Sequence, residues 1–127
     1  MEATTYSFRS CIRGYHVYKD IWDSVVGEVL DCEHEPDNPH DTHAVAVKRV
    51  QDQGGMQQIV GHVPLTLSRV FHLFLKHGGQ ISVEVTGKRR NKGIGLEIPA
   101  TYLFYHKKPS KVKKLIELIR DKEESRS

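Results

Sequence analysis

The chain is 127 residues long, enough for one compact domain and too short for two ordinary ones. Apolar residues make up 38% and charged residues 28% of it, as in water-soluble globular proteins, and no apolar run approaches the roughly 18 residues of a membrane-spanning helix. Its formal net charge of +3 is too small to indicate a binding partner by itself.

The N-terminal segment carries acidic and hydroxyl side chains where a secretory signal would have basic and then apolar residues. We therefore expect an intracellular protein, nuclear or cytoplasmic.

Residues 6–13 place apolar side chains at roughly alternate positions up to Gly14, which predicts a strand that ends in a turn. Cys11 and Cys32 both fall in predicted strands, where free thiols are favoured over a disulfide or a metal pair.

A second strand is predicted over residues 22–33, where valine and leucine are frequent and Gly27 favours a bulge or bend. Acidic residues are concentrated here, because residues 20–41 contain many Asp and Glu residues but no Lys or Arg. Residues 35–41, EPDNPHD, combine two prolines with Asp and Asn, and this composition predicts a tight, ordered loop.

The clearest hairpin joins residues 44–50 to residues 58–63, since both runs are rich in valine and a Gln-Gly-Gly turn lies between them. A helix follows, with Thr66 or Ser68 as its expected N-cap, and it ends at the glycine pair 78–79. Its core face is predicted from apolar residues at helical spacing, namely Leu67, Val70, Phe71, Phe74 and Leu75.

The C-terminal part contains two further strands and a helix. Residues 81–85 alternate apolar and polar side chains and are expected to pair with residues 96–105 across the basic turn at 88–95. Beyond Pro109, apolar residues at helical spacing predict an amphipathic helix, its stripe formed by Val112, Leu115, Ile116 and Ile119.

Together these elements predict a mainly β fold, a small barrel of about six strands with one inserted helix and a C-terminal helix. A barrel is favoured because closure removes the unpaired edges that short strands otherwise expose. We expect the barrel domain to cover residues 1–106, followed by a basic linker and the amphipathic helix over residues 107–127.

Three stretches carry a family resemblance: His16 and Tyr18 after a glycine, EPDNPHDTHAVAV at 35–47, and IVGHVP at 59–64 before a helix. Over about residues 7–106 the chain resembles the HIRAN domain, found at the N-terminus of some SWI/SNF-type DNA remodellers and in stand-alone proteins. The resemblance implies an OB-like barrel. In the remodeller branch it also implies a pocket that holds the 3′-hydroxyl end of single-stranded DNA, with bases stacked on aromatics and an acidic side chain accepting from the terminal hydroxyl.

The resemblance assigns candidate pocket residues by position. The Asn-Pro-x-Asp and Gly-His motifs give Asn38, His40, Asp41 and His62, and His16 falls where the family has a basic residue. Two positions depart from the remodeller pattern: His40 stands where that branch has Tyr, and Val17 replaces an aromatic. Tyr15 and Tyr18 lie beside Val17 and are candidates for the stacking role.

The residue types alone, without the resemblance, predict a less specific site for an unpaired nucleotide. A flat ring and polar acceptors suit a pocket for an unpaired nucleotide, because stacking contributes about 1–3 kcal/mol per base. Asn38 and Asp41 have a local alternative as well, since both side chains are able to bond their own backbone and hold the proline-bounded turn.

Two basic groups add candidate phosphate contacts. The first, in the turn between the last two strands, consists of Lys88, Arg89, Arg90 and Lys92. Such a cluster either follows a phosphate backbone or is simply solvated, and the sequence leaves both open. The second, Lys107, Lys108, Lys111, Lys113 and Lys114, reads as an electrostatic arm or a nuclear-import signal.

Metal binding and catalysis are not expected. His34, His40 and His43 stand near Asp37 and Asp41, but ligands of a structural site usually come in pairs from two separated segments. We therefore expect no metal and no cofactor, and no recognisable catalytic motif indicates an enzyme.

The expected partner is single-stranded nucleic acid, DNA more than RNA, and no membrane. A protein-interaction module that uses the barrel groove or the C-terminal helix is the alternative.

Overall fold

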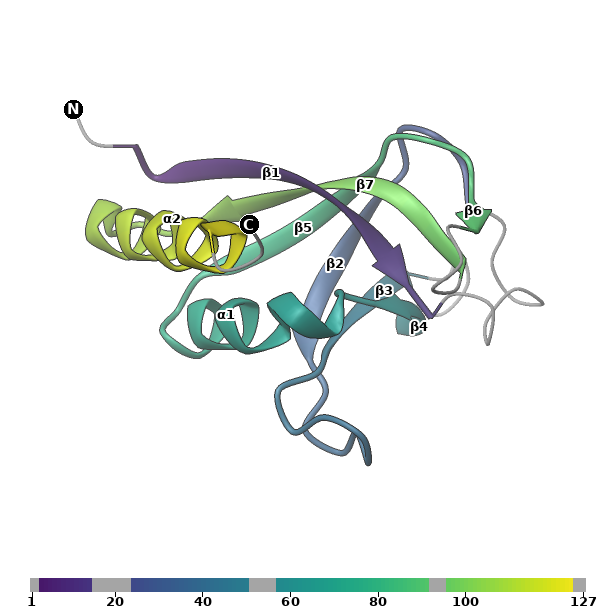
Figure 1. Cartoon of the computed structure of the whole chain (residues 1–127), viewed down its shortest axis with the longest axis horizontal. Helices are drawn as coiled ribbons and strands as arrows, with labels where there is room; N and C mark the ends of the chain where they lie inside the picture. The colour runs from purple at the N-terminus through teal and green to yellow at the C-terminus, as the bar shows by residue number, and fades with distance from the viewer. Residues whose placement is uncertain (1–2, 15–23, 51–56, 92–95, 125–127) are drawn as a thin grey trace.

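The computed structural model describes residues 3–14, 24–50, 57–91 and 96–124 (Figure 1). Its strands are β1 (Thr5–Arg13), β2 (Val29–His34), β3 (Val45–Val50), β4 (Gln57–His62), β5 (Gln80–Val85), β6 (Arg90–Asn91) and β7 (Leu96–Tyr105). Its helices are α1 (Leu65–Lys76) and α2 (Pro109–Glu124). No helix within the described residues is both long and apolar enough to span a membrane.

Six of the strands form a closed antiparallel ring in the order β1-β4-β3-β2-β5-β7. The ring closes because all nine residues of β1 pair with β7, from Thr5 opposite Tyr105 to Arg13 opposite Glu97. The two-residue strand β6 adds a short antiparallel pairing to β7. The mainly β barrel with one inserted helix and a C-terminal helix, predicted from the sequence, is confirmed.

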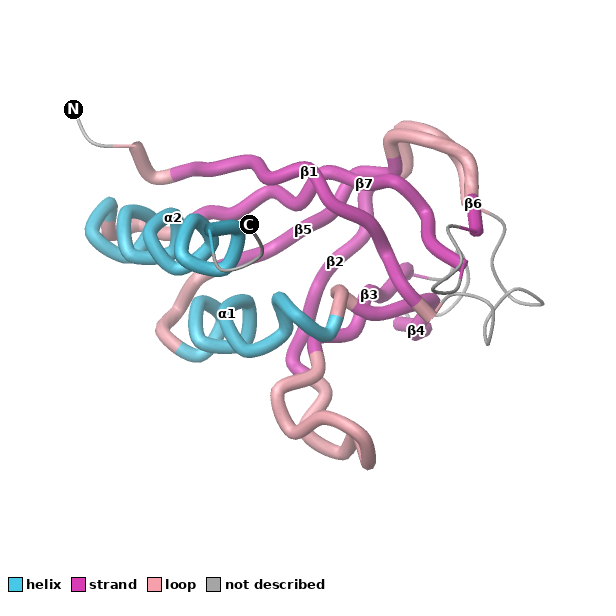
Figure 2. Tube along the Cα trace, in the orientation of Figure 1, coloured by secondary structure: helices cyan, strands magenta, loops and turns pink. Residues whose placement is uncertain are grey.

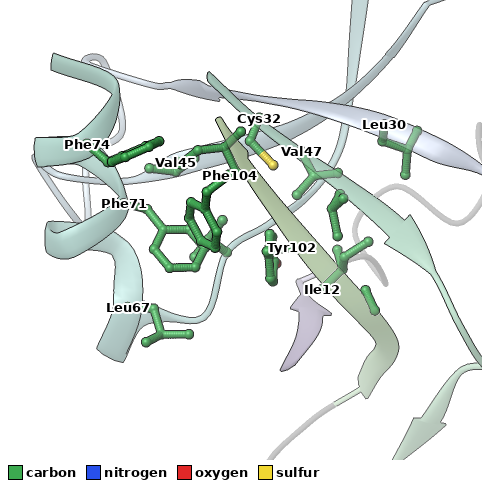
Figure 3. Packing of buried hydrophobic residues seen from close by; sticks show 14 of the residues in the cluster. Ile12, Leu30, Cys32, Val45, Val47, Leu67, Phe71, Phe74, Tyr102 and Phe104 are labelled. Atoms are coloured by element: carbon green, nitrogen blue, oxygen red, sulfur yellow. The ribbon is translucent and has the colours of Figure 1, made fainter. Parts of the chain in front are cut away.

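The barrel interior is filled by the alternate residues that the strand pattern turns inward, and α1 covers one end of it (Figures 1 and 3). Phe71 of α1 meets the rings of Tyr102 and Phe104 edge to face, with centroids 5.0 Å and 4.9 Å apart. The buried Tyr102 hydroxyl donates to the carbonyl of Cys11 at 2.7 Å, so its one polar group is satisfied inside the core.

The C-terminal helix lies beside α1 and joins the same core (Figure 2). Val112, Leu115 and Ile119, three residues of the predicted stripe, are buried in the cluster that fills the barrel. These three residues of the apolar face of α2 are therefore already used by the domain itself.

Both cysteines are free, as expected. Burial, with a smaller contribution from Glu97, raises the pKa of the Cys11 thiol to about 11, and burial raises that of Cys32 still further. Neither thiol is therefore a reactive thiolate at neutral pH.

Three local predictions differ from the structure. Residues 22 and 23 of the strand expected over residues 22–33 lie outside the described residues, and the strand begins only at Val29. Gly27 adopts a φ of 94° in the preceding turn, where the backbones of Gly27 and Glu28 bond Val85. Helix α1 starts at Leu65 with Pro64 as its N-cap and no side-chain cap, so neither Thr66 nor Ser68 caps it. The expected basic turn is partly a strand, since it contains β6.

Candidate functional site

The loop between β2 and β3 is held by its own polar side chains. The Asn38 Oδ1 atom accepts from the backbone N–H groups of His40 and Asp41 at 2.9 Å and 3.0 Å. The Asp41 Oδ1 atom accepts from the N–H of His43 at 2.9 Å. The local, turn-building role of Asn38 and Asp41 is thus confirmed.

Asp41 also attaches this loop to α1. Its second oxygen, Oδ2, accepts from the Ser68 hydroxyl at 2.7 Å. Burial acts to raise the pKa of Asp41, but the hydrogen bonds from Ser68 and His43 outweigh it and hold that pKa below its usual value. The ionised carboxylate therefore joins the loop to the helix.

Glu35 attaches the start of the loop to the Gly61-His62 corner. Its Oε1 atom accepts from Asn38 Nδ2 at 2.7 Å and from His62 Nε2 at 3.0 Å, although His62 is 27 residues away in the chain. Burial favours a higher pKa for Glu35, yet these two bonds and the charges of His62 and Lys48 leave it below the usual value. Since the carboxylate is ionised, His62 Nε2 carries the hydrogen.

These two segments border a hollow of about 760 Å³, which we call the loop pocket. Four of the sequence-predicted residues line it: Asn38, His40, Asp41 and His62. The other lining residues are Arg13, Gly14, His34, Glu35, Pro36, Asp37, Pro39, Ala44, Lys48, Ile59, Val63 and Leu65. Leu65, 73% exposed, adds an open apolar surface to the prolines and aliphatic side chains of the wall.

The loop pocket combines this apolar wall with charged groups. Arg13 lies 3.7 Å from the carboxylate of Glu97, and Lys48 lies 2.9 Å from that of Glu33. His40 is exposed and uses only its backbone N–H in the loop's bonds to Asn38. The arrangement offers polar edges for hydrogen bonds and flat or aliphatic surfaces for a base, while its two cations are each paired with a carboxylate and share the lining with Glu35, Asp37 and Asp41.

Three of the remaining predicted site residues are described by the structure. Lys88 and Arg89 are exposed between β5 and β6 and do not line the loop pocket, and Arg90 belongs to β6. Tyr15, His16, Tyr18 and Lys92 lie outside the described residues.

Two histidines of the loop, His34 and His43, contact a histidine of α1. The ring of His34 lies 4.0 Å, and that of His43 5.3 Å, from the ring of His72 in α1, measured between centroids. In the described ranges, no three His, Cys, Asp or Glu side chains are grouped so as to hold a metal ion.

Sequence reasoning missed four residues that shape the pocket: Glu35, Ser68, Arg13 and Lys48. A signal existed for Glu35, which opens the EPDNP run, and for Arg13, which precedes the glycine that ends β1. Nothing local in the sequence marks Ser68 or Lys48, because their positions depend on how α1 and β3 pack.

Comparisons with known proteins bear on the fold and the family of the chain. The family model of the HIRAN domain matches residues 6–113. The crystal structure of the HIRAN domain of human HLTF is similar, with a TM-score of 0.66, 20% sequence identity and coverage of 91% of this chain and 88% of that one. No curated protein matches the chain. The chain therefore belongs to the HIRAN domain family, a family of nucleic-acid-binding modules.

Proposed function

We propose that the loop pocket binds an unpaired nucleotide of single-stranded nucleic acid, and that DNA with a free 3′ end is the preferred ligand. The observation that carries this proposal is the convergence of Asn38, His40 and Asp41 with His62 on one open hollow. Its volume of about 760 Å³ lies within the range of roughly 300–1,000 Å³ of ligand pockets, which suits a nucleotide.

Each lining group has a role in this proposal. His40 stacks on the base or bonds its edge, and Leu65 with the prolines forms the opposite apolar surface. Arg13 and Lys48 attract the phosphate, which makes binding weaker at higher salt. Asp41 accepts the terminal hydroxyl with the lone pairs that its bonds to His43 and Ser68 leave.

The residues outside this description complete the proposed interface. Tyr15, His16 and Tyr18 follow Gly14, which itself lines the loop pocket, so they are candidates for stacking on a second base. Lys88, Arg89, Arg90 and Lys92 are candidates for contacts with a more distant phosphate. DNA is proposed ahead of RNA because the resemblance is to the HIRAN domains of DNA remodellers, since a terminal 3′-hydroxyl is common to both nucleic acids.

Fluorescence anisotropy with a labelled ten-nucleotide DNA tests the proposal at low salt. We expect tighter binding with a free 3′-hydroxyl than with a 3′-phosphate. His40→Ala should weaken binding by roughly 5- to 150-fold, which corresponds to the loss of about 1–3 kcal/mol of stacking. His77→Ala, at an exposed histidine outside the loop pocket, is the matched control and should leave the affinity unchanged.

Two outcomes contradict different parts of the proposal. Equal affinity for free and blocked 3′ ends excludes end recognition. If no binding is seen at low salt, the pocket is not a nucleic-acid-binding site.

A further inference from the structure

A second hollow, of about 270 Å³, lies between α1 and α2 and shares no lining residue with the loop pocket. We call it the helix groove, and its lining residues are Val70, Leu73, Phe74, His77, Lys111, Lys114, Leu115 and Leu118. Val70, Phe74 and Leu115 are buried and form its floor, whereas Leu73 and Leu118 are half-buried and form its walls. The groove is therefore apolar inside and open to solvent.

The rim of the helix groove is positively charged. Helix α1 contains no acidic residue, and the first turn of α2 has none either. Lys111 and Lys114 stand three residues apart on the groove side of α2, where like charges repel each other. Neither lysine forms an ion pair with a described residue. The positive end of the α2 dipole adds to the same field.

We propose that the helix groove binds an acidic amphipathic segment of another protein, with one or two apolar side chains inserted and carboxylates on Lys111 and Lys114. The volume is below the roughly 300 Å³ at which small-molecule sites begin, so it suits side-chain anchors better than a whole small molecule. Nucleic acid fits less well, because the walls are aliphatic and the ring of Phe74 is buried, which leaves the imidazole of His77 as the one exposed flat surface among the lining residues.

A synthetic peptide provides the probe. It is a fluorescein-labelled 16-residue helix former with leucines at i, i+3, i+4 and i+7, glutamates at the positions that flank this stripe, and alanines elsewhere. We expect the wild-type protein to bind it and the double variant Lys111→Glu/Lys114→Glu to lose about tenfold or more in affinity, since two surface ion pairs become repulsive. Lys107→Glu/Lys113→Glu makes the same change of net charge outside the groove lining and is the matched control.

Mapping on the wild-type protein gives an independent readout. Addition of the glutamate-leucine peptide should shift backbone amide signals of residues 70–77 and 111–118, and the same peptide with lysine in place of glutamate should not. Each of three results overturns the proposal: no binding at millimolar peptide, equal losses in the two double variants, or shifts confined to other residues. Shifts at the groove caused by a DNA oligonucleotide and not by the peptide assign the surface to nucleic acid instead.

Discussion

At the scale of single residues, the loop pocket depends on the two different ends of one amide. Asn38 accepts two backbone N–H groups with its oxygen and donates to Glu35 with its nitrogen. Aspartate has the acceptor but not the donor, and alanine has neither. Asn38 is thus the position at which the loop's shape and its attachment to the Gly61-His62 corner are most tightly coupled.

Asn38→Asp is therefore expected to destabilise the protein by about 1–3 kcal/mol at pH 7, because two carboxylates then face each other at Glu35. The stability should recover as the pH falls toward about 4, where one carboxyl group takes up a proton and donates to the other. Urea denaturation at both pH values measures this. Asn38→Ala is the control, and its loss of stability should change less with pH. If Asn38→Asp is as stable as the wild type at pH 7, the prediction is wrong.

A second residue, His72, lowers the stability of the fold. Its Nδ1 atom is buried and has no hydrogen-bond partner. Burial lowers its pKa, the neighbouring charges of His34, His43 and Lys76 lower it further, and Asp41 opposes them. In the unfolded chain the imidazole takes up its proton near pH 6.5, whereas in the folded protein it does so only at lower pH. Through His72 the free energy of unfolding is therefore highest above about pH 6.5 and decreases as the pH falls below that value.

His72→Phe keeps a ring against His34 and His43 but removes the unsatisfied nitrogen and the proton uptake. We expect the variant to be more stable by about 1–3 kcal/mol, with a weaker loss of stability between about pH 7 and pH 5. Thermal denaturation over that pH range provides the measurement. A variant that is less stable than the wild type at every pH shows that Nδ1 has a partner in solution.

At the scale of elements, Ser68 attaches the pocket loop to helix α1. Ser68→Ala removes the bond to Asp41 Oδ2, and we expect a loss of about 1 kcal/mol together with faster amide hydrogen exchange in residues 38–44. Arg69→Ala, at the exposed neighbouring position of the same helix, is the control. Faster exchange of the whole domain, and not of this loop, indicates that Ser68 supports the core instead.

The elements differ in how far the sequence predicts them. Alternating side chains predicted β1, β5 and β7, because each has one face in the core and one in solvent. The start of β2 was wrong, since the bend expected at Gly27 precedes the strand instead of lying within it. The internal bonds of Asn38 and Asp41 were predictable because they span two or three residues. The bonds of Glu35 and Asp41 to His62 and Ser68 span 27 residues and follow from tertiary packing alone.

At the scale of the whole molecule, the barrel is a ring whose first and last strands pair. The Tyr102 hydroxyl bonds a carbonyl 91 residues away, and no local pattern of the sequence predicts such a contact. The short strands favoured a closed barrel and the family resemblance implied the same fold, while only the resemblance made His62 a candidate pocket residue. The two binding surfaces proposed above lie on different parts of this ring and its helices, so they are separable by point substitutions.

The packing of α2 leads to a prediction about cooperativity. Leu115 is buried in the same cluster as the barrel residues, so Leu115→Ala should lower the free energy of unfolding of the entire domain by about 2–5 kcal/mol. Far-ultraviolet circular dichroism, which follows the helices, and near-ultraviolet dichroism, which follows buried rings such as Tyr102, should then give the same urea midpoint. Lys113→Ala, at an exposed position of α2, should leave that midpoint unchanged. If the helix signal is lost first while the ring signal keeps its wild-type midpoint, residues 107–127 are an appendage to a barrel of residues 1–106.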